Sequence, residues 1–150
     1  MQQMQICAHP FMAPLLAQAA ASAKPLVHRA RKAQIRPMTR ALVNAYAATL
    51  PGASVSDPWG GGHDTWKVGG KMFAGVGARD DHGVDVKCPD IETAQLLIEI
   101  GRARRARYLH ASWVTVPFGV VEDAEMCDRI LISYRLIRAG LPKQVQAGLG

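Results

Sequence analysis

The chain has 150 residues, of which 49% are hydrophobic and 20% charged, and its formal net charge is +6. This length supports one domain with a single core, and no apolar run reaches the roughly 20 residues needed to cross a bilayer. Cys7, Cys88 and Cys127 are widely spaced without a Cys-x-x-Cys pair, which argues against a disulfide framework or a zinc site and favours reduced thiols in the cytoplasm.

The positive charge is concentrated at the start of the chain. Residues 1–36 hold five basic and no acidic residues, which leaves 13 basic and 12 acidic residues in the remainder. Residues 11–23 are alanine-rich and end in a small-x-small sequence, as signal-peptidase sites do, but no Lys or Arg precedes them. The Arg-rich, acid-free character is also typical of a transit peptide. We favour instead a disordered basic extension, or a natural start at Met38, so the net charge says little about DNA binding by the folded part.

The folded part, 37–150, is predicted to begin with an amphipathic helix. Apolar residues of 39–50 recur at i, i+3, i+4 and i+7, Thr39 is placed to cap the helix, and Pro51-Gly52 ends it. Residues 53–56 are short and β-branched at their centre, which predicts a first strand.

Residues 57–74 contain two of the three tryptophans and five of the fourteen glycines. Three successive glycines at 60–62 let the chain reverse. Residues 65–68 then alternate polar and apolar, and Gly69-Gly70 separates them from a returning apolar segment at 71–76. This pattern predicts a β-hairpin with Lys67 and Lys71 beside its tip.

The rest of the chain alternates between further strands and helices. A polar turn at 79–83 precedes a strand at 84–88, a helix capped by Asp90 and ended by Gly101, and a strand at 113–116. A last helix begins near Glu122, and Gly140 and Pro142 end it, with the final residues expected to fray. The order of elements predicts an α+β fold: a two-layer sandwich with an antiparallel sheet and helices on one face.

Several short motifs resemble the MmcQ/YjbR family of small bacterial proteins. They occur in the family's order from about Met38 to the C-terminus: Pro-Gly-Ala at 51–53, Pro-Trp-Gly at 58–60, the hairpin at 67–74, Lys-Cys-Pro at 87–89, Ser133-Tyr134 and Leu-Pro-Lys at 141–143. The resemblance implies a fold akin to bacterial frataxin and a double-wing DNA-binding surface, in which the hairpin at Gly69-Gly70 would be one wing. It also raises iron binding, which we disfavour because the helix at 39–50 has no acidic residue.

No set of residues forms a catalytic or metal site in the sequence. The glycines do not match a phosphate-binding loop, and the five histidines lack metal-ligand spacing. His63 with Asp64 is the one pair worth testing, although a locally hydrogen-bonded loop histidine is the favoured interpretation. Ser112 and Ser133 have no recognisable partners, and Cys88 is interpreted as a buried structural thiol. We therefore expect no enzyme activity, no cofactor and no metal.

Aromatic and basic residues are the remaining candidates for binding. Trp59, Trp66 and Trp113 could stack on bases, but we interpret all three as core residues, together with Phe73 and Tyr134. The arginines of residues 101–107 are harder to explain by folding alone, since a loop this rich in arginine repels itself unless an anion offsets the charge. The predicted DNA-binding residues are Lys67, Lys71, Arg102, Arg104, Arg105 and Arg107.

These observations predict a cytoplasmic, non-enzymatic DNA-binding protein whose binding is weak, salt-sensitive and directed at phosphates. The prediction requires the arginines and the hairpin lysines to lie side by side on one exposed face. The alternative is an interaction module that docks an acidic protein through its arginine-rich loop. A small-molecule enzyme is a third hypothesis, which a polar cleft containing His63 would support. No membrane partner is expected, and a monomer is favoured.

Overall fold

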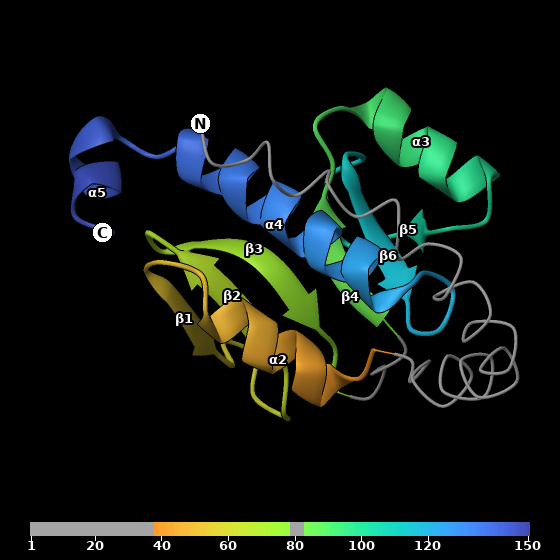
Figure 1. Ribbon diagram of the computed structural model, residues 1–150, viewed down its shortest axis with the longest axis horizontal. Coiled ribbons are helices and arrows are strands. Elements are labelled where there is room, and N and C mark those ends of the chain that lie inside the picture. Colours follow the sequence, from red (N-terminus) through yellow and green to blue (C-terminus); the bar gives the residue numbers. More distant parts are fainter. Residues whose placement is uncertain (1–37, 79–82) are drawn as a thin grey trace, which may run out of the picture. The chain divides into compact units, whose positions relative to one another are not determined.

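The computed structural model describes residues 38–78 and 83–150, which form the helices and strands of Figure 1. Contacts divide the chain into Met1–Arg36 and Pro37–Gly150, and everything below concerns the second unit. The predicted basic extension and most of the predicted turn at 79–83 lie outside the described residues.

The described residues form one six-stranded sheet in the order β1-β2-β3-β4-β6-β5, and every neighbouring pair is antiparallel. The strands are β1 (Ala53–Ser56), β2 (Asp64–Val68), β3 (Lys71–Val76), β4 (Gly83–Lys87), β5 (Arg104–Arg105) and β6 (Trp113–Pro117). The helices are α2 (Arg40–Ala48), α3 (Ile91–Glu99), α4 (Asp123–Ala139) and α5 (Lys143–Ala147). Figure 1 shows α2 and α4 over the same face of the sheet. The predicted α+β class is confirmed.

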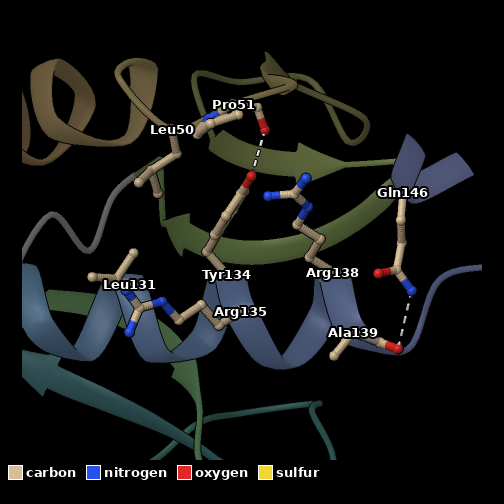
Figure 2. Close-up of a pocket in the computed structure, with 8 residues that line it drawn as sticks. All are labelled: Leu50, Pro51, Leu131, Tyr134, Arg135, Arg138, Ala139 and Gln146. Atoms are coloured by element: carbon tan, nitrogen blue, oxygen red, sulfur yellow. Dashed lines mark hydrogen bonds between the residues drawn. The ribbon is translucent and has the colours of Figure 1, made fainter. Parts of the chain in front are cut away.

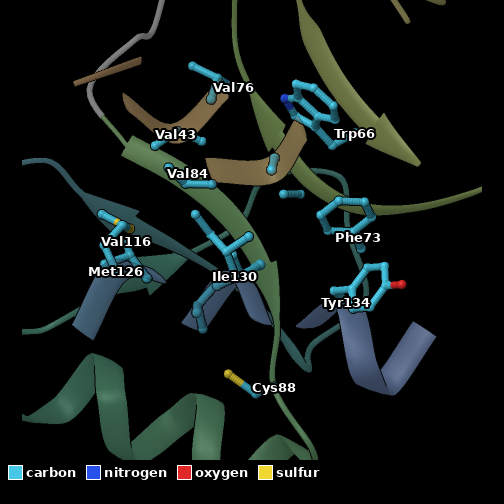
Figure 3. Close-up of a cluster of buried hydrophobic side chains, with 14 of the residues drawn as sticks. Val43, Trp66, Phe73, Val76, Val84, Cys88, Val116, Met126, Ile130 and Tyr134 are labelled. Atoms are coloured by element: carbon cyan, nitrogen blue, oxygen red, sulfur yellow. The ribbon is translucent and has the colours of Figure 1, made fainter. Parts of the chain in front are cut away.

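The core lies between that face of the sheet and the helices (Figure 3). Alternate residues of two neighbouring interior strands point into it: Val84 and Val86 from β4, and Val114 and Val116 from β6, each no more than 1% exposed. Met126 and Ile130 of α4 are fully buried in the same cluster. Because side chains alternate between faces, the intervening strand residues point to the opposite face, which we call the outer face.

The helix ends follow the sequence signals. Thr39 is the N-cap of α2 without a side-chain cap, whereas the Asp90 carboxylate accepts a hydrogen bond from the Thr93 N–H at 2.6 Å at the start of α3. Gly101 follows α3 with φ +75°, a conformation that favours glycine, and Gly140 ends α4. These local features explain why the helix boundaries were predictable.

Ser133 joins α4 to the sheet where β3 and β4 separate. Its hydroxyl group donates to the Phe73 carbonyl oxygen at 2.5 Å and accepts from the Lys87 N–H at 2.8 Å. The side chain is fully buried, so these two hydrogen bonds satisfy backbone groups that would otherwise lack partners. Both partners are backbone groups, so Ser133 has a structural role that the sequence did not reveal.

Three predictions about local structure are wrong. The arginine-rich segment is not simply a loop, because Arg104 and Arg105 pair with Thr115 and Val114 as the edge strand β5. The C-terminus does not fray after Gly140, since α5 follows and Leu149 packs against the core. Trp59 is 69% exposed rather than part of the core. The other tryptophans, Phe73 and Tyr134 are buried as predicted.

Candidate nucleic-acid interface

The sheet register places the β2–β3 tip and the β5–β6 loop at the same end of the sheet. One transverse row runs through Trp66, Ala74, Val86, Val114 and Arg105. From this row, β2 continues to its tip at Gly69-Gly70, and β5 continues into the loop 106–112, in the same direction. The two connections are not neighbours, because β4 and β6 separate β3 from β5 by about 14 Å at the usual strand spacing.

The predicted hairpin is confirmed, with Lys67 and Lys71 next to its tip. Lys71 pairs with Val68 and is exposed, whereas Lys67 pairs with Met72 and is half-buried. Neither lysine forms an ion pair within residues 38–78 and 83–150. A Cβ atom on Gly69 would lie 2.5 Å from Leu141 Cδ1, so the α4–α5 connection covers one side of the tip.

The four arginines have different surroundings. Arg102 forms an ion pair with Glu125, whose other carboxylate oxygen lies 3.3 Å from Arg129 Nη2. Arg105 and Arg107 are exposed and form no ion pair with any described residue. Arg102 also precedes β5 and therefore extends toward the opposite end of the sheet from the hairpin tip. The structure thus brings two arginines, not four, to the end that carries Lys67 and Lys71.

Arg104 lies across the outer face from a carboxylate. Arg104 pairs with Thr115, and Thr115 pairs with Asp85, so the three side chains share one row. The Thr115 hydroxyl group donates to Asp85 Oδ1 at 2.5 Å. Burial raises the pKa of Asp85, while the Thr115 hydrogen bond and the charge of Arg104 oppose that rise. Arg104 is therefore partly compensated by a neighbouring acid.

Tyr108, which the sequence-based search did not select, is the most exposed large hydrophobic side chain of the described residues. It lies in the β5–β6 loop directly after Arg107, is 101% exposed and has φ +65°, a conformation rare for a non-glycine residue. An aromatic residue directly after a run of arginines was the available sequence signal. Arginine and exposed aromatic rings together are typical of surfaces on which nucleic-acid bases stack.

Lys87, Ser112 and His110 form a hydrogen-bonded group at the base of this loop. Lys87 Nζ donates to Ser112 Oγ at 2.9 Å, and Ser112 Oγ lies 3.0 Å from His110 Nδ1. These hydrogen-bond partners of Ser112 were not recognised in the sequence analysis. Ser112 is only 3% exposed, so its hydroxyl group orders the loop rather than meeting a substrate as a nucleophile.

Local hydrogen bonds hold the Gly-rich bend. His63 Nδ1 lies 3.2 Å from the Gly60 carbonyl oxygen, which confirms the favoured interpretation of this histidine, and its ring packs edge-on against Trp59 at 5.5 Å. Asp64 pairs with Arg40 rather than with His63. Among the described residues, no group of three or more His, Cys, Asp or Glu side chains is placed to hold a metal ion.

Cys88 is 3% exposed, and burial raises the pKa of its thiol. A thiol with a raised pKa is a poor nucleophile at neutral pH. The interpretation of Cys88 as a structural residue is consistent with both observations.

Two comparisons with known proteins match this architecture. The YjbR family model matches residues 48–136. A crystal structure of a Deinococcus radiodurans protein with a DUF419 domain superimposes with a TM-score of 0.67 at 23% identity, over 75% of this chain and 88% of that one. No curated protein matches the chain.

The fold defines a class of small α+β proteins in which helices cover one face of an antiparallel sheet. The YjbR family model matches more than half of the chain, and the chain therefore belongs to the MmcQ/YjbR family. No helix within residues 38–78 and 83–150 combines the length and apolar character that a membrane span requires.

Proposed function

We propose that the chain is a non-enzymatic DNA-binding protein that contacts the phosphate backbone through one end of its sheet. The observation that carries this proposal is the shared end of the β2–β3 tip and the β5–β6 loop. Lys67, Lys71, Arg105 and Arg107 lie there without ion-pair partners among the described residues. Guanidinium and ammonium groups without protein partners are available to phosphate oxygens.

The same geometry makes the binding weak. Four phosphate contacts are few, Arg102 is paired with Glu125, and Asp85 lies in the same row as Arg104. Affinity that comes from phosphate contacts is sequence-independent and falls steeply with salt. We therefore assign the interface to Lys67, Lys71, Arg105 and Arg107, with a smaller contribution from Arg104 and the least from Arg102.

Fluorescence anisotropy with a labelled DNA duplex at low and moderate salt tests the proposal. The double variants Lys67→Gln/Lys71→Gln and Arg105→Gln/Arg107→Gln should each weaken binding several-fold. The matched control is Arg102→Gln/Arg129→Gln, which also removes two positive charges, but from arginines that share the carboxylate of Glu125. Absence of binding at low salt, or equal losses in all three variants, would contradict the proposed interface.

A second function is supported by exposed apolar side chains on α3, which contacts β5. Leu96 of α3 is 55% exposed, and Ile100, the C-cap residue of that helix, is 56% exposed. The Ile100 N–H donates to the Leu96 carbonyl oxygen at 3.0 Å, so the two residues lie on the same side of the helix end. Apolar residues next to arginines are typical of protein–protein interfaces. If this surface docks an acidic protein, Leu96→Ser/Ile100→Ser should abolish recovery of that protein from nuclease-treated extract without changing DNA binding.

A further inference from the structure

A cleft of about 450 Å³ lies between the α2–β1 turn, the C-terminal half of α4, and α5 (Figure 2). This volume is in the range of small-molecule sites, but the cleft is wide open to solvent, so a bound ligand would stay partly exposed. Apolar groups of Leu50, Pro51, Leu131 and Ala139 form much of its lining. The cleft contains none of the residues assigned above to DNA binding.

One wall of the cleft is fixed by buried contacts. Tyr134 is 3% exposed, and its hydroxyl group donates to the Pro51 carbonyl oxygen at 2.6 Å. Its ring packs edge-on against Phe73 with centroids 5.3 Å apart. The α2–β1 turn is thereby tied to α4, and the cleft exists before any ligand enters.

Two arginines supply the charge of the cleft. Arg135 and Arg138 line it, no Asp or Glu does, and neither arginine forms an ion pair with a described residue. In Figure 2 the Arg138 side chain rises from α4 on the same side as Tyr134, whereas Arg135 extends along the helix toward Leu131. The two cations therefore lie toward different ends of the cleft, with Tyr134 between them.

Termination of α4 does not account for both arginines. The carbonyl groups of Leu136 and Ile137 accept hydrogen bonds from the Gly140 N–H, and Gln146 Nε2 donates to the Ala139 carbonyl oxygen at 3.4 Å. Arg138 lies in the last turn, where the helix dipole favours a cation, but Arg135 lies one turn earlier, where that effect has decayed. Helix termination therefore accounts for Arg138 at most, and Arg135 has no role in ending α4.

We propose that this cleft binds a small organic anion, a phosphate monoester or a carboxylate with an apolar body. Arg138 contacts the anionic group, since a guanidinium fork suits both phosphate and carboxylate oxygens. The apolar body rests on Leu50 and Leu131, and Arg135 adds attraction from the other end. This site shares no residue with the proposed DNA interface, although the α4–α5 connection next to it also packs against the hairpin tip at Gly69.

Isothermal titration with four probes tests the proposal: phenyl phosphate, 3-phenylpropionate, inorganic phosphate and benzyl alcohol. At least one of the two aromatic anions should bind more tightly than both controls. Inorganic phosphate lacks the apolar body, and benzyl alcohol lacks the anionic group. The preferred aromatic anion distinguishes a phosphate from a carboxylate ligand. Equal binding of this anion and inorganic phosphate, or no binding of either aromatic anion at millimolar concentration, would overturn the proposal.

Variants locate the binding within the cleft. Arg138→Gln should weaken the preferred aromatic anion about tenfold and Arg135→Gln about threefold. Arg138→Lys should give an intermediate loss, because it keeps the charge without the fork. The control Arg129→Gln removes one charge from an arginine of the same helix outside the cleft, and it should leave binding unchanged. Unchanged affinity in Arg138→Gln, with folding verified by circular dichroism, contradicts the assignment.

The two proposals fail independently. Lys67→Gln/Lys71→Gln should weaken DNA binding and leave the aromatic-anion titration unchanged. A loss of both activities in that variant would show that the cleft and the sheet end are not separate sites.

Discussion

Asp85 and Arg104 lie on the outer face of the sheet in one transverse row, one on each side of Thr115. Arg104, which the sequence analysis predicted to bind DNA, thus has the carboxylate of Asp85 two strands away. Thr115 donates a hydrogen bond to that acid and keeps it in place. This relationship limits the cationic potential of the outer face and moves the proposed interface toward the end of the sheet.

Replacement of Asp85 by Asn should stabilise the protein at neutral pH. Burial raises the pKa of Asp85, so the folded state binds this proton more tightly than the unfolded state does. The free energy of unfolding therefore falls as the pH rises from the ordinary carboxyl pKa through the raised one. Urea unfolding should give Asp85→Asn a larger free energy of unfolding than wild type at neutral pH, and the difference should be smaller in acid. A variant less stable than wild type at neutral pH would contradict this account of Asp85.

Asp64 should behave in the opposite way. Its hydrogen bond with Arg40 Nε at 2.5 Å is the main cause that lowers the pKa of Asp64, and Asn44 donates a second hydrogen bond at 2.7 Å. This stabilisation is present above the ordinary carboxyl pKa and is lost as the pH falls through the lowered one. Asp64→Asn should cost roughly 1–2 kcal/mol at neutral pH, where the ion pair is formed. Urea unfolding of Asp64→Asn and wild type across the acid range measures this loss of stability. If the loss persisted unchanged in strong acid, where Asp64 is protonated, that result would argue against the ion pair.

Ser133→Ala should be among the more destabilising conservative substitutions in the chain. It leaves the Phe73 carbonyl group and the Lys87 N–H without a partner in a buried position, which we expect to cost roughly 2–3 kcal/mol. Ser56→Ala is the matched control, because the buried Ser56 hydroxyl group has no hydrogen-bond partner among the described residues. Chemical denaturation should show a large loss for the first variant and almost none for the second. Equal losses would mean that the Ser133 bridge does not form.

The role of Ser133 shows where prediction from the sequence ends. Helix ends depend on neighbouring residues such as Asp90 and Gly101, so they could be predicted, as could the hairpin at Gly69-Gly70. The partners of Ser133 lie 46 and 60 residues away, and no local pattern contains them. The same holds for Ser112, whose lysine partner lies 25 residues away.

The candidate site was predictable only in its composition. The residue types marked a basic, aromatic-rich segment, but β5 has only two residues, too few for a strand pattern to be seen. Because the register of β5 against β6 is not visible in the sequence, the sequence could not show that Arg105 and Arg107 lie at the same end of the sheet as the hairpin tip. Nor could it show that Arg102 pairs with Glu125, because that contact joins different elements.

The tryptophans give a direct test of which side chains belong to the core. Trp66 is 6% exposed, and its Nε1 donates to Asn44 Oδ1 at 2.8 Å, so Trp66→Phe should lose about 1 kcal/mol from that hydrogen bond and more from reduced packing. Trp59→Phe should change stability by less than about 0.5 kcal/mol, because this side chain is largely in solvent. Thermal unfolding of the two variants measures the difference. A Trp59 variant as destabilised as the Trp66 variant would place Trp59 in the core after all.

The most direct test of the DNA-binding interface is the dependence of the association constant for duplex DNA on salt. If Lys67, Lys71, Arg105 and Arg107 each neutralise one phosphate, the logarithm of this constant should fall against the logarithm of salt concentration with a slope of about −3.6. Each double variant, Lys67→Gln/Lys71→Gln or Arg105→Gln/Arg107→Gln, should reduce the steepness by about 1.8, while Arg102→Gln/Arg129→Gln should reduce it much less. A slope near zero, or a slope that the first two variants do not alter, would contradict the interface.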